Sequence, residues 1–363
     1  MNNDTAVNRL KLVRARMKKA EVDCLIVTVN ENICYLTGFT GHDSWLLVSN
    51  RCATLVTDSR YTEQAKGECF GCEIFERTGS ITKASAKIVG GKKVIATIGV
   101  EDSMSIAIHK AIKKEFSAKV KPVSGIVEAV RRTKDDEEMK NIQKAAKISY
   151  ECLFETLNGL KPGMSESDLA GILEYEMRKR GVIKFFDTII CFGPNASRNH
   201  HQPGPRKLKK NDSILIDFGA KFNSYGCDIT RSFSVGKPTP MYEKVWFTVK
   251  AAQQAAIEAI KPGVKMSEVD KICRDVIAQS GLPVYGHGTG HGLGLEVHET
   301  IRIAKESKDI FQVGDILTVE PGIYMPGKLG VRIEDDVLVT ETGYKILSND
   351  TKFGFSGPDM PVL

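Results

Sequence analysis

Five side chains able to bind a metal interrupt apolar, strand-like runs in the C-terminal half of the chain. In order, they are Asp217, Asp228, His291, Glu320 and Glu334. The run around the first reads Ile-Leu-Ile-Asp-Phe-Gly, and the other four lie in similar short runs. An ionised carboxylate among Ile, Leu and Val is costly to bury unless it is paired or coordinates a cation. The pattern therefore favours a fold that gathers several strands around a metal centre.

The set of donor atoms limits the kind of metal. Four carboxylates, one imidazole and no thiolate suit manganese, cobalt or zinc, and they argue against a structural zinc site. Four carboxylates would overload a single ion, whereas two ions roughly 3.5–4 Å apart can share two of them as bridges. The sequence therefore predicts a dinuclear centre.

The length of the chain predicts two domains. With 363 residues it exceeds a single core, which rarely grows beyond about 250–300 residues. No apolar run approaches the roughly 20 residues of a membrane span, and the polar start Met-Asn-Asn-Asp-Thr does not resemble a signal peptide. We therefore expect a cytoplasmic protein that does not contact a membrane.

Charge and cysteine content point to an ordinary intracellular surface. The net charge of +6 comes from lysines spread along the chain, without a nucleic-acid-binding motif, so no nucleic-acid partner is expected. Nine cysteines are scattered, and the one close pair, Cys69 and Cys72, has no second pair to complete a zinc site. Reduced thiols are expected.

The N-terminal part alternates helical and strand-like segments. An amphipathic pattern at 9–20 predicts a helix, and apolar runs predict strands at 24–29, 45–48 and 53–57. A polar connector lies at 124–133, and the acidic residues that follow suit a helix N-terminus. These segments predict a small α/β domain at 1–130 and a second domain at 131–363.

The second domain contains an internal duplication. Helical patterns at 137–157 and 242–260 are each followed by Lys-Pro-Gly, and then by a Ser-Glu helix start, at Ser165 and at Ser267. The helices that follow are expected to end at Gly181 and Gly281. The strands also match, because the run from Asp212 to Asp217 aligns with the run from Asp315 to Glu320.

This duplication explains the ligand set. Two strand pairs related by a pseudo-twofold axis would bring four carboxylates together, two from each half, with helices covering the outer face. His291 breaks the symmetry and lies in a glycine-rich run, His287-Gly-Thr-Gly-His291-Gly. The glycine spacing there does not match a dinucleotide-binding fingerprint.

These motifs resemble the metallopeptidase family that includes aminopeptidase P, prolidase and methionine aminopeptidase. The resemblance covers nearly the whole chain and includes the N-terminal runs 35–41 and 57–61, a domain that methionine aminopeptidases lack. It implies an α/β (α+β) architecture. A creatinase-like N-terminal domain would precede a pita-bread catalytic domain with a pseudo-twofold repeat.

The resemblance also implies a role for each ligand. Asp228 and Glu334 would bridge two ions, manganese first and cobalt or zinc as alternatives. Asp217 would bind one ion, and His291 and Glu320 the other. A bridging hydroxide would be the nucleophile, with Glu320 as the proton shuttle.

Three histidines are assigned roles by the same resemblance. His298 would stabilise the tetrahedral intermediate, and His287 and His200 would shape the substrate pocket, although a purely structural histidine is the alternative for each. Arg332 precedes Glu334 by two residues, which on a strand places both side chains on one face. Arg332 is therefore expected to support the ligands from behind, with a surface ion pair as the alternative. Asp335 and Asp336 match no family ligand and are left outside the site.

Two loops depart from the family pattern. Relatives commonly have Leu-Pro-His-Gly where this chain has Arg198-Asn-His-His, and His-Glu-x-Pro where it has His298-Glu-Thr-Ile. These changes leave the ligands intact but affect the expected substrate pocket. His201 is either an accidental neighbour or a change in specificity.

The resulting hypothesis is an Xaa-Pro peptidase acting on short proline-containing peptides, with dimer formation through the N-terminal domain as in relatives. The N-terminal runs favour aminopeptidase P slightly over prolidase. One alternative is a non-catalytic pita-bread binding protein, and another is a creatinase-like, metal-free C–N hydrolase. Such relatives lack part of the ligand set, which is complete here.

Overall fold

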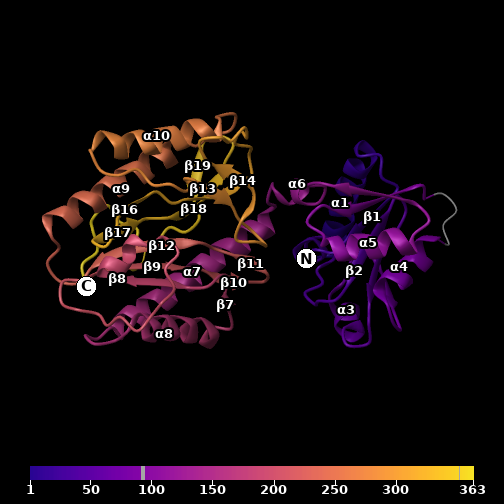
Figure 1. Ribbon diagram of the computed structural model, residues 1–363, viewed down its shortest axis with the longest axis horizontal. Helices are drawn as coiled ribbons and strands as arrows, with labels where there is room; N and C mark the ends of the chain where they lie inside the picture. Colours follow the sequence, from indigo (N-terminus) through magenta and orange to yellow (C-terminus); the bar gives the residue numbers. More distant parts are fainter. Residues whose placement is uncertain (91–94, 351) are drawn as a thin grey trace. The chain divides into compact units, whose positions relative to one another are not determined.

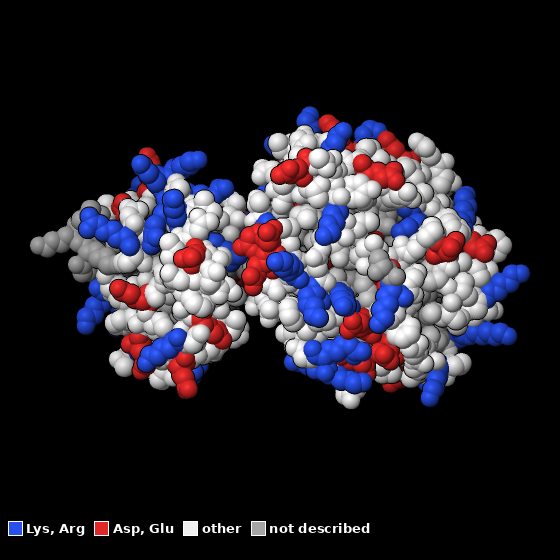
Figure 2. Space-filling model, turned by 180° about the vertical axis from the view of Figure 1, so that it is seen from behind, with Lys and Arg blue, Asp and Glu red and all other residues white. Residues whose placement is uncertain are grey.

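The computed structural model describes residues 1–90, 95–350 and 352–363, and its contacts divide the chain into two compact units (Figure 1). The first is Met1–Arg131 and the second is Arg132–Leu363. In the part of the chain that the structure describes, no helix is both long and apolar enough to span a membrane. On the face drawn in Figure 2, Lys and Arg side chains are interspersed with Asp and Glu on each unit.

The N-terminal unit is built on one mixed sheet of six strands in the order β4-β3-β2-β1-β5-β6. The strands are β1 (Cys24–Val27), β2 (Trp45–Ser49), β3 (Ala53–Thr57), β4 (Glu73–Glu76), β5 (Thr97–Glu101) and β6 (Lys119–Val123). The helices are α1 (Asn3–Lys19), α2 (Asn30–Thr37), α3 (Thr62–Glu68), α4 (Ile81–Gly90), α5 (Ile106–Glu115) and α6 (Glu128–Arg131). The α/β class expected for this part of the chain is confirmed.

Two element boundaries in this unit differ from the sequence expectation. Helix α1 begins at Asn3, well before residue 9, because the Asn2 side chain accepts a hydrogen bond from the Thr5 N–H and caps the helix. Strand β1 ends at Val27 because the Glu101 carboxylate takes the N–H groups of the next two residues, at 2.7 and 2.9 Å.

The C-terminal unit consists of two similar halves. The first half contains α7 (Asp136–Asn158), α8 (Glu166–Lys179), β7 (Ile183–Lys184), β8 (Ile189–Phe192), the 3-10 helix η1 (Gly193–Ser197), β9 (Ser213–Phe218), β10 (Ala220–Phe222), β11 (Tyr225–Gly226) and β12 (Ile229–Ser234). The second half contains α9 (Pro240–Glu258), α10 (Met266–Gln279), β13 (Gly290–Gly292), β14 (Glu299–Ile303), β15 (Ile316–Val319), β16 (Gly322–Met325), β17 (Leu329–Arg332), β18 (Asp335–Val339) and β19 (Tyr344–Ile346). Helices α9 and α10 lie on one side of the strands, and α7 and α8 on the other (Figure 1).

The repeat is clearest in α8 and α10, which have fourteen residues each. Helix α8 is capped by Ser165, as expected. The expected start at Ser267 is wrong, because α10 already begins at Met266 after the N-cap residue Lys265. Met266 is fully buried in the apolar core, and its packing fixes the first turn without a side-chain cap.

Along the central strands, side chains alternate between the apolar core on one face and the cavity on the other. In β9, Ile214, Ile216 and Phe218 pack in the core cluster that includes residues of α7 and α8, so the intervening Asp217 faces the opposite side. In β15, Leu317 and Val319 pack with residues of α9 and α10 in the same way. The helices thus cover the outer faces of the strands, and the acidic side chains point inward.

Candidate metal centre

The five expected ligands come from five different places on the inner strands. Asp217 lies within β9, and His291 is the central residue of β13. Asp228 and Glu334 immediately precede β12 and β18, and Glu320 immediately follows β15. All five line one cavity of 460 Å³, together with the three expected histidines and Arg332.

The closest group in this cavity is Asp228, His291 and Glu334, whose ligand atoms all lie within 4.8 Å of one another. His291 Nε2 lies 3.7 Å from Asp228 Oδ2 and 3.4 Å from Glu320 Oε1. On its other side, His291 Nδ1 lies 3.2 Å from the Gly292 carbonyl oxygen and donates to it. This hydrogen bond leaves Nε2 free to bind a metal.

The residues present fit a divalent metal. Among the described residues, the buried Asp217 Oδ1 has no hydrogen-bond partner. Burial raises the pKa of Asp228 well above its ordinary value, and the nearby Glu334 and Asp217 raise it further. Burial also lowers the pKa of His291 to about 3, so this imidazole is neutral and able to act as a ligand. Several carboxylates this close to one another, beside a neutral imidazole, can all be ionised only when a cation compensates their charge.

Arg332 forms an ion pair with one of these carboxylates. It is 4% exposed, and its Nη2 donates to Asp217 Oδ2 at 2.5 Å, so this ion pair is buried and not at the surface. Its Nε donates to Thr230 Oγ1 at 3.0 Å, and Thr230 Oγ1 in turn donates to Glu334 Oε2 at 2.6 Å. Arg332 and Thr230 thereby orient one carboxylate from each half of the unit.

The three histidines lie at different depths in the cavity. The His298 ring is exposed and packs edge-on against the His291 ring, with centroids 4.3 Å apart. His287 is half-buried, and its Nε2 lies 3.1 Å from the Tyr324 hydroxyl. His200 is exposed and lines the same cavity.

The two loops that depart from the family pattern are placed differently. Asn199 lines the cavity, so the first departure lies at the pocket itself. Ile301 is 3% exposed and packs in the apolar core, so its side chain points away from the cavity. Ile301 therefore belongs to the core packing of β14 and adds no side chain to the pocket.

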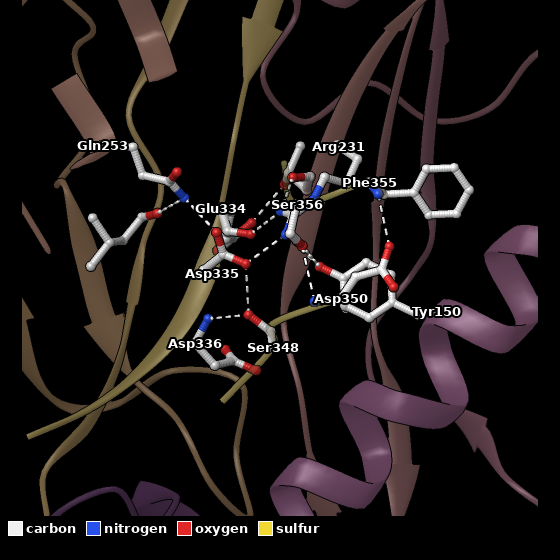
Figure 3. Close-up of polar contacts among 12 residues, drawn as sticks. Tyr150, Arg231, Gln253, Glu334, Asp335, Asp336, Ser348, Asp350, Phe355 and Ser356 are labelled. Atoms are coloured by element: carbon white, nitrogen blue, oxygen red, sulfur yellow. Dashed lines mark hydrogen bonds and ion pairs between the residues drawn. The ribbon is translucent and has the colours of Figure 1, made fainter. Parts of the chain in front are cut away.

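A buried polar network lies behind Glu334 (Figure 3). The Arg231 guanidinium is 2% exposed, forms an ion pair with Asp335 at 2.5 Å and donates to the Glu334 carbonyl oxygen at 2.5 Å. Ser348 and Gln253 complete the hydrogen bonds to the Asp335 carboxylate, at 2.8 and 2.9 Å. On the far side, the Arg231 Nη2 donates to the Tyr150 hydroxyl. The network joins the strands that follow Asp228 and Glu334.

Sequence reasoning missed Arg231, Thr230 and one further residue, Arg302. Arg302 lines the cavity from β14, where exposed and buried residues alternate. It is the cross-strand partner of His291, so both side chains project from the same face of the sheet. The signal available in the sequence was the alternation after His298, which places Arg302 on the cavity side.

Comparison with known proteins decides the family. The model of metallopeptidase family M24 matches residues 140–341, and that of the creatinase/prolidase N-terminal domain matches residues 9–133. The chain belongs to metallopeptidase family M24. The expected order of an N-terminal creatinase-like domain and a pita-bread catalytic domain is thereby confirmed.

Relatives of this M24 metallopeptidase match over nearly their whole length. An Xaa-Pro dipeptidase from Pyrococcus horikoshii is 32% identical over 95% of this chain and 98% of the relative. The structure of an Xaa-Pro dipeptidase from Bacillus anthracis is 34% identical, with a TM-score of 0.93 over 99% of this chain and 100% of that one. An X-Pro aminopeptidase from Thermotoga maritima is also 34% identical, with a TM-score of 0.88 over 96% and 100%.

Proposed function

We propose that this M24 metallopeptidase hydrolyses the bond between an N-terminal residue and proline in short peptides, and that it prefers Xaa-Pro dipeptides. The observation that carries the proposal is a cavity that combines the complete carboxylate–imidazole set with a cationic side chain, Arg302, facing the same space. The names of the matched relatives include both Xaa-Pro dipeptidases and an X-Pro aminopeptidase, so they do not distinguish dipeptides from longer substrates. The residues of this chain's own cavity support the preferred substrate length.

Two divalent ions, manganese first, are proposed for the centre. Asp228 and Glu334 would be shared by both ions, Asp217 would bind one, and His291 and Glu320 the other. When bound, such ions supply an activated water whose pKa is lowered to about 7, and they polarise the scissile carbonyl. The remaining work of binding, orientation and proton transfer falls to the side chains of this chain.

Glu320 and His298 are the candidates for that work. The Glu320 side chain is 17% exposed against 8% for Asp228, so it is the more accessible for passing a proton to the leaving proline nitrogen. His298 is exposed beside His291, where an N–H donor can face the oxygen of the scissile carbonyl. Such a donor binds the developing oxyanion more tightly than the ground state.

Replacing His298 by Ala is expected to lower kcat for Ala-Pro by about 10²–10³-fold, the usual cost of losing one oxyanion donor. Bound metal per chain and the melting temperature should stay near wild-type values, because the side chain is exposed. Steady-state kinetics with metal analysis checks this. A loss of bound metal in the variant would instead assign His298 to the metal centre.

Arg302 supports the preference for dipeptides. Among the described residues none forms an ion pair with its guanidinium, and the nearby Arg332 is occupied by Asp217. A dipeptide carries a C-terminal carboxylate on the proline itself, next to the bond that is cleaved. Guanidinium and carboxylate can form a charge-assisted, two-point contact. A longer peptide lacks this carboxylate at the same place.

Replacing Arg302 by Met is expected to lower kcat/KM for Ala-Pro by roughly 10–100-fold, because a hydrogen bond to a charged group contributes about 1.5–3 kcal/mol. Turnover of Ala-Pro amide, which lacks the carboxylate, should change less than about threefold. Arg302→Lys, which keeps the charge but not the fork, is the matched control. Equal losses on both substrates, with Ala-Pro-Ala the better substrate of the wild type, would favour an aminopeptidase P.

The compartment and the oligomeric state of the enzyme are proposed from the sequence and the family. We expect a cytoplasmic homodimer whose creatinase/prolidase N-terminal domain mediates association. Among the described residues, no cysteine is in a disulfide bond, which suits a reducing compartment.

A further inference from the structure

The loop that carries His200 is tied to a buried carboxylate. This loop connects β8 to β9 and begins with η1. His201 Nε2 lies 2.8 Å from Glu166 Oε2, and the two side chains are 11% and 0% exposed. Glu166 is the first residue of α8, where the helix dipole favours a negative charge. The contact is therefore a buried one between the loop and a rigid helix.

Glu166 holds the loop at several points. Its Oε1 accepts from the Phe192 N–H at 2.8 Å and from the Asn195 side chain at 2.9 Å. Its Oε2 accepts from the Gly204 N–H at 3.1 Å as well as from His201. One carboxylate thus contacts the chain at four points between residues 192 and 204, in the first part of the loop.

His201 itself does not face the substrate space. Its neighbours His200 and Gln202 line the cavity, and His201 is not among the lining residues. The His201 side chain is directed to Glu166 instead. A direct contact between His201 and a bound peptide is therefore not part of its role.

His200 occupies a defined place in a tight turn. The His201 N–H donates to the Arg198 carbonyl oxygen at 3.2 Å, which makes Asn199 and His200 the two central residues of a four-residue turn. The Asn199 carbonyl oxygen accepts from Arg332 Nη1 at 3.3 Å. The turn is therefore anchored to Arg332 on one side and to Glu166 on the other.

The residue at the first central position of the turn explains why the turn needs the contact between His201 and Glu166. Proline would pre-set the backbone at the first central position of a turn, and this chain has Asn199 there. Asparagine gives no such restraint. The order of the turn must then come from contacts outside it.

We infer that His201 is a positioning residue: its contact with Glu166 fixes the turn that presents His200 to the substrate, and supplies a restraint that Asn199 does not give to the backbone of the turn. The inference rests on the proposed function and adds a determinant of substrate binding to it. His201 acts only through the turn, so its loss should weaken substrate binding more than the chemical step.

A double-mutant cycle between positions 199 and 201 tests this. His201→Ala is expected to raise KM for Ala-Pro about tenfold, with kcat changed less than about threefold. His201→Gln should keep most of the wild-type KM, because its amide can donate to Glu166. In an Asn199→Pro background, His201→Ala should raise KM less than about threefold, because proline then restrains the turn.

The backbone of the turn accepts proline. Arg198 has φ −106° and ψ 108°, an extended conformation that suits a residue before proline. Among the described residues, none accepts a hydrogen bond from the Asn199 N–H. Asn199→Pro should therefore leave the hydrogen bond between residues 198 and 201 in place.

Hydrogen exchange of the backbone amide of residue 201 reports on the turn without an activity assay. We expect faster exchange in His201→Ala and slower exchange again when Asn199→Pro is added. Unchanged KM and exchange in His201→Ala, or equal effects of His201→Ala in both backgrounds, would overturn the inference. If the wild type cleaves no Xaa-Pro peptide, the proposed function fails. The exchange pattern alone then decides whether His201 restrains the turn.

Discussion

Replacing Asp228 by Asn is expected to lower kcat for Ala-Pro by at least about 10³-fold, because the proposed metal ions would contribute several kcal/mol of transition-state stabilisation. The carboxylate lies within 4.8 Å of the His291 and Glu334 ligand atoms, so both proposed ion positions depend on it. The amide keeps the shape of the side chain but removes the charge. Steady-state kinetics with saturating manganese measures the loss.

Measuring the metal bound by the same variant distinguishes loss of the metal centre from loss of the fold. We expect Asp228→Asn to bind fewer than two ions per chain while its circular dichroism stays at the wild-type value. Asp275→Asn, which changes a half-exposed aspartate paired with Lys271 on α10, is the matched control and should change neither quantity. Full activity in Asp228→Asn would contradict the assignment of this residue as a shared ligand.

Replacing Arg231 by Met is expected to destabilise the C-terminal unit by about 3–5 kcal/mol, because it leaves the Asp335 carboxylate buried without its partner. Both side chains are almost inaccessible, at 2% and 4% exposure. The loss should exceed that of any exposed ion pair of this chain, since such pairs contribute about 0–1 kcal/mol.

Urea denaturation can measure this loss for the catalytic unit alone. The chain has two tryptophans, and Trp246 donates to the Ser232 carbonyl oxygen on β12. In a Trp45→Phe background, Trp246 is the remaining tryptophan, so the tryptophan fluorescence reports on the C-terminal unit. Adding Asp335→Leu to Arg231→Met should recover part of the stability, since apolar residues can replace a buried pair. A loss below about 1 kcal/mol in the single variant would show that the pair is not needed.

The sequence singles out the candidate ligands because their side chains are out of place in their surroundings. A carboxylate such as Asp217 within an Ile-Leu-Ile run has few explanations other than a partner of opposite charge. The helix start at Ser267 is wrong because a capping pattern is a local signal, whereas burial of Met266 in the core decides where α10 begins. Tertiary packing overrides local preference here.

The residues that sequence reasoning missed depend on distant parts of the chain. Arg231 is fixed by Asp335, and nothing near either residue in the sequence indicates the other. His201 stands next to the expected His200, but its partner Glu166 belongs to an earlier helix. Arg302 could have been found from the strand alternation, whereas its position opposite His291 requires the strand register.

The most direct test of the account is to remove all metal from the protein and measure turnover of Ala-Pro while manganese is added back. The account predicts no turnover without metal, and recovery that is complete when two ions are bound per chain. Cobalt and zinc, added in parallel, would rank the alternatives. Turnover that persists without metal, or no turnover of any Xaa-Pro peptide at full metal occupancy, would contradict a dinuclear Xaa-Pro peptidase.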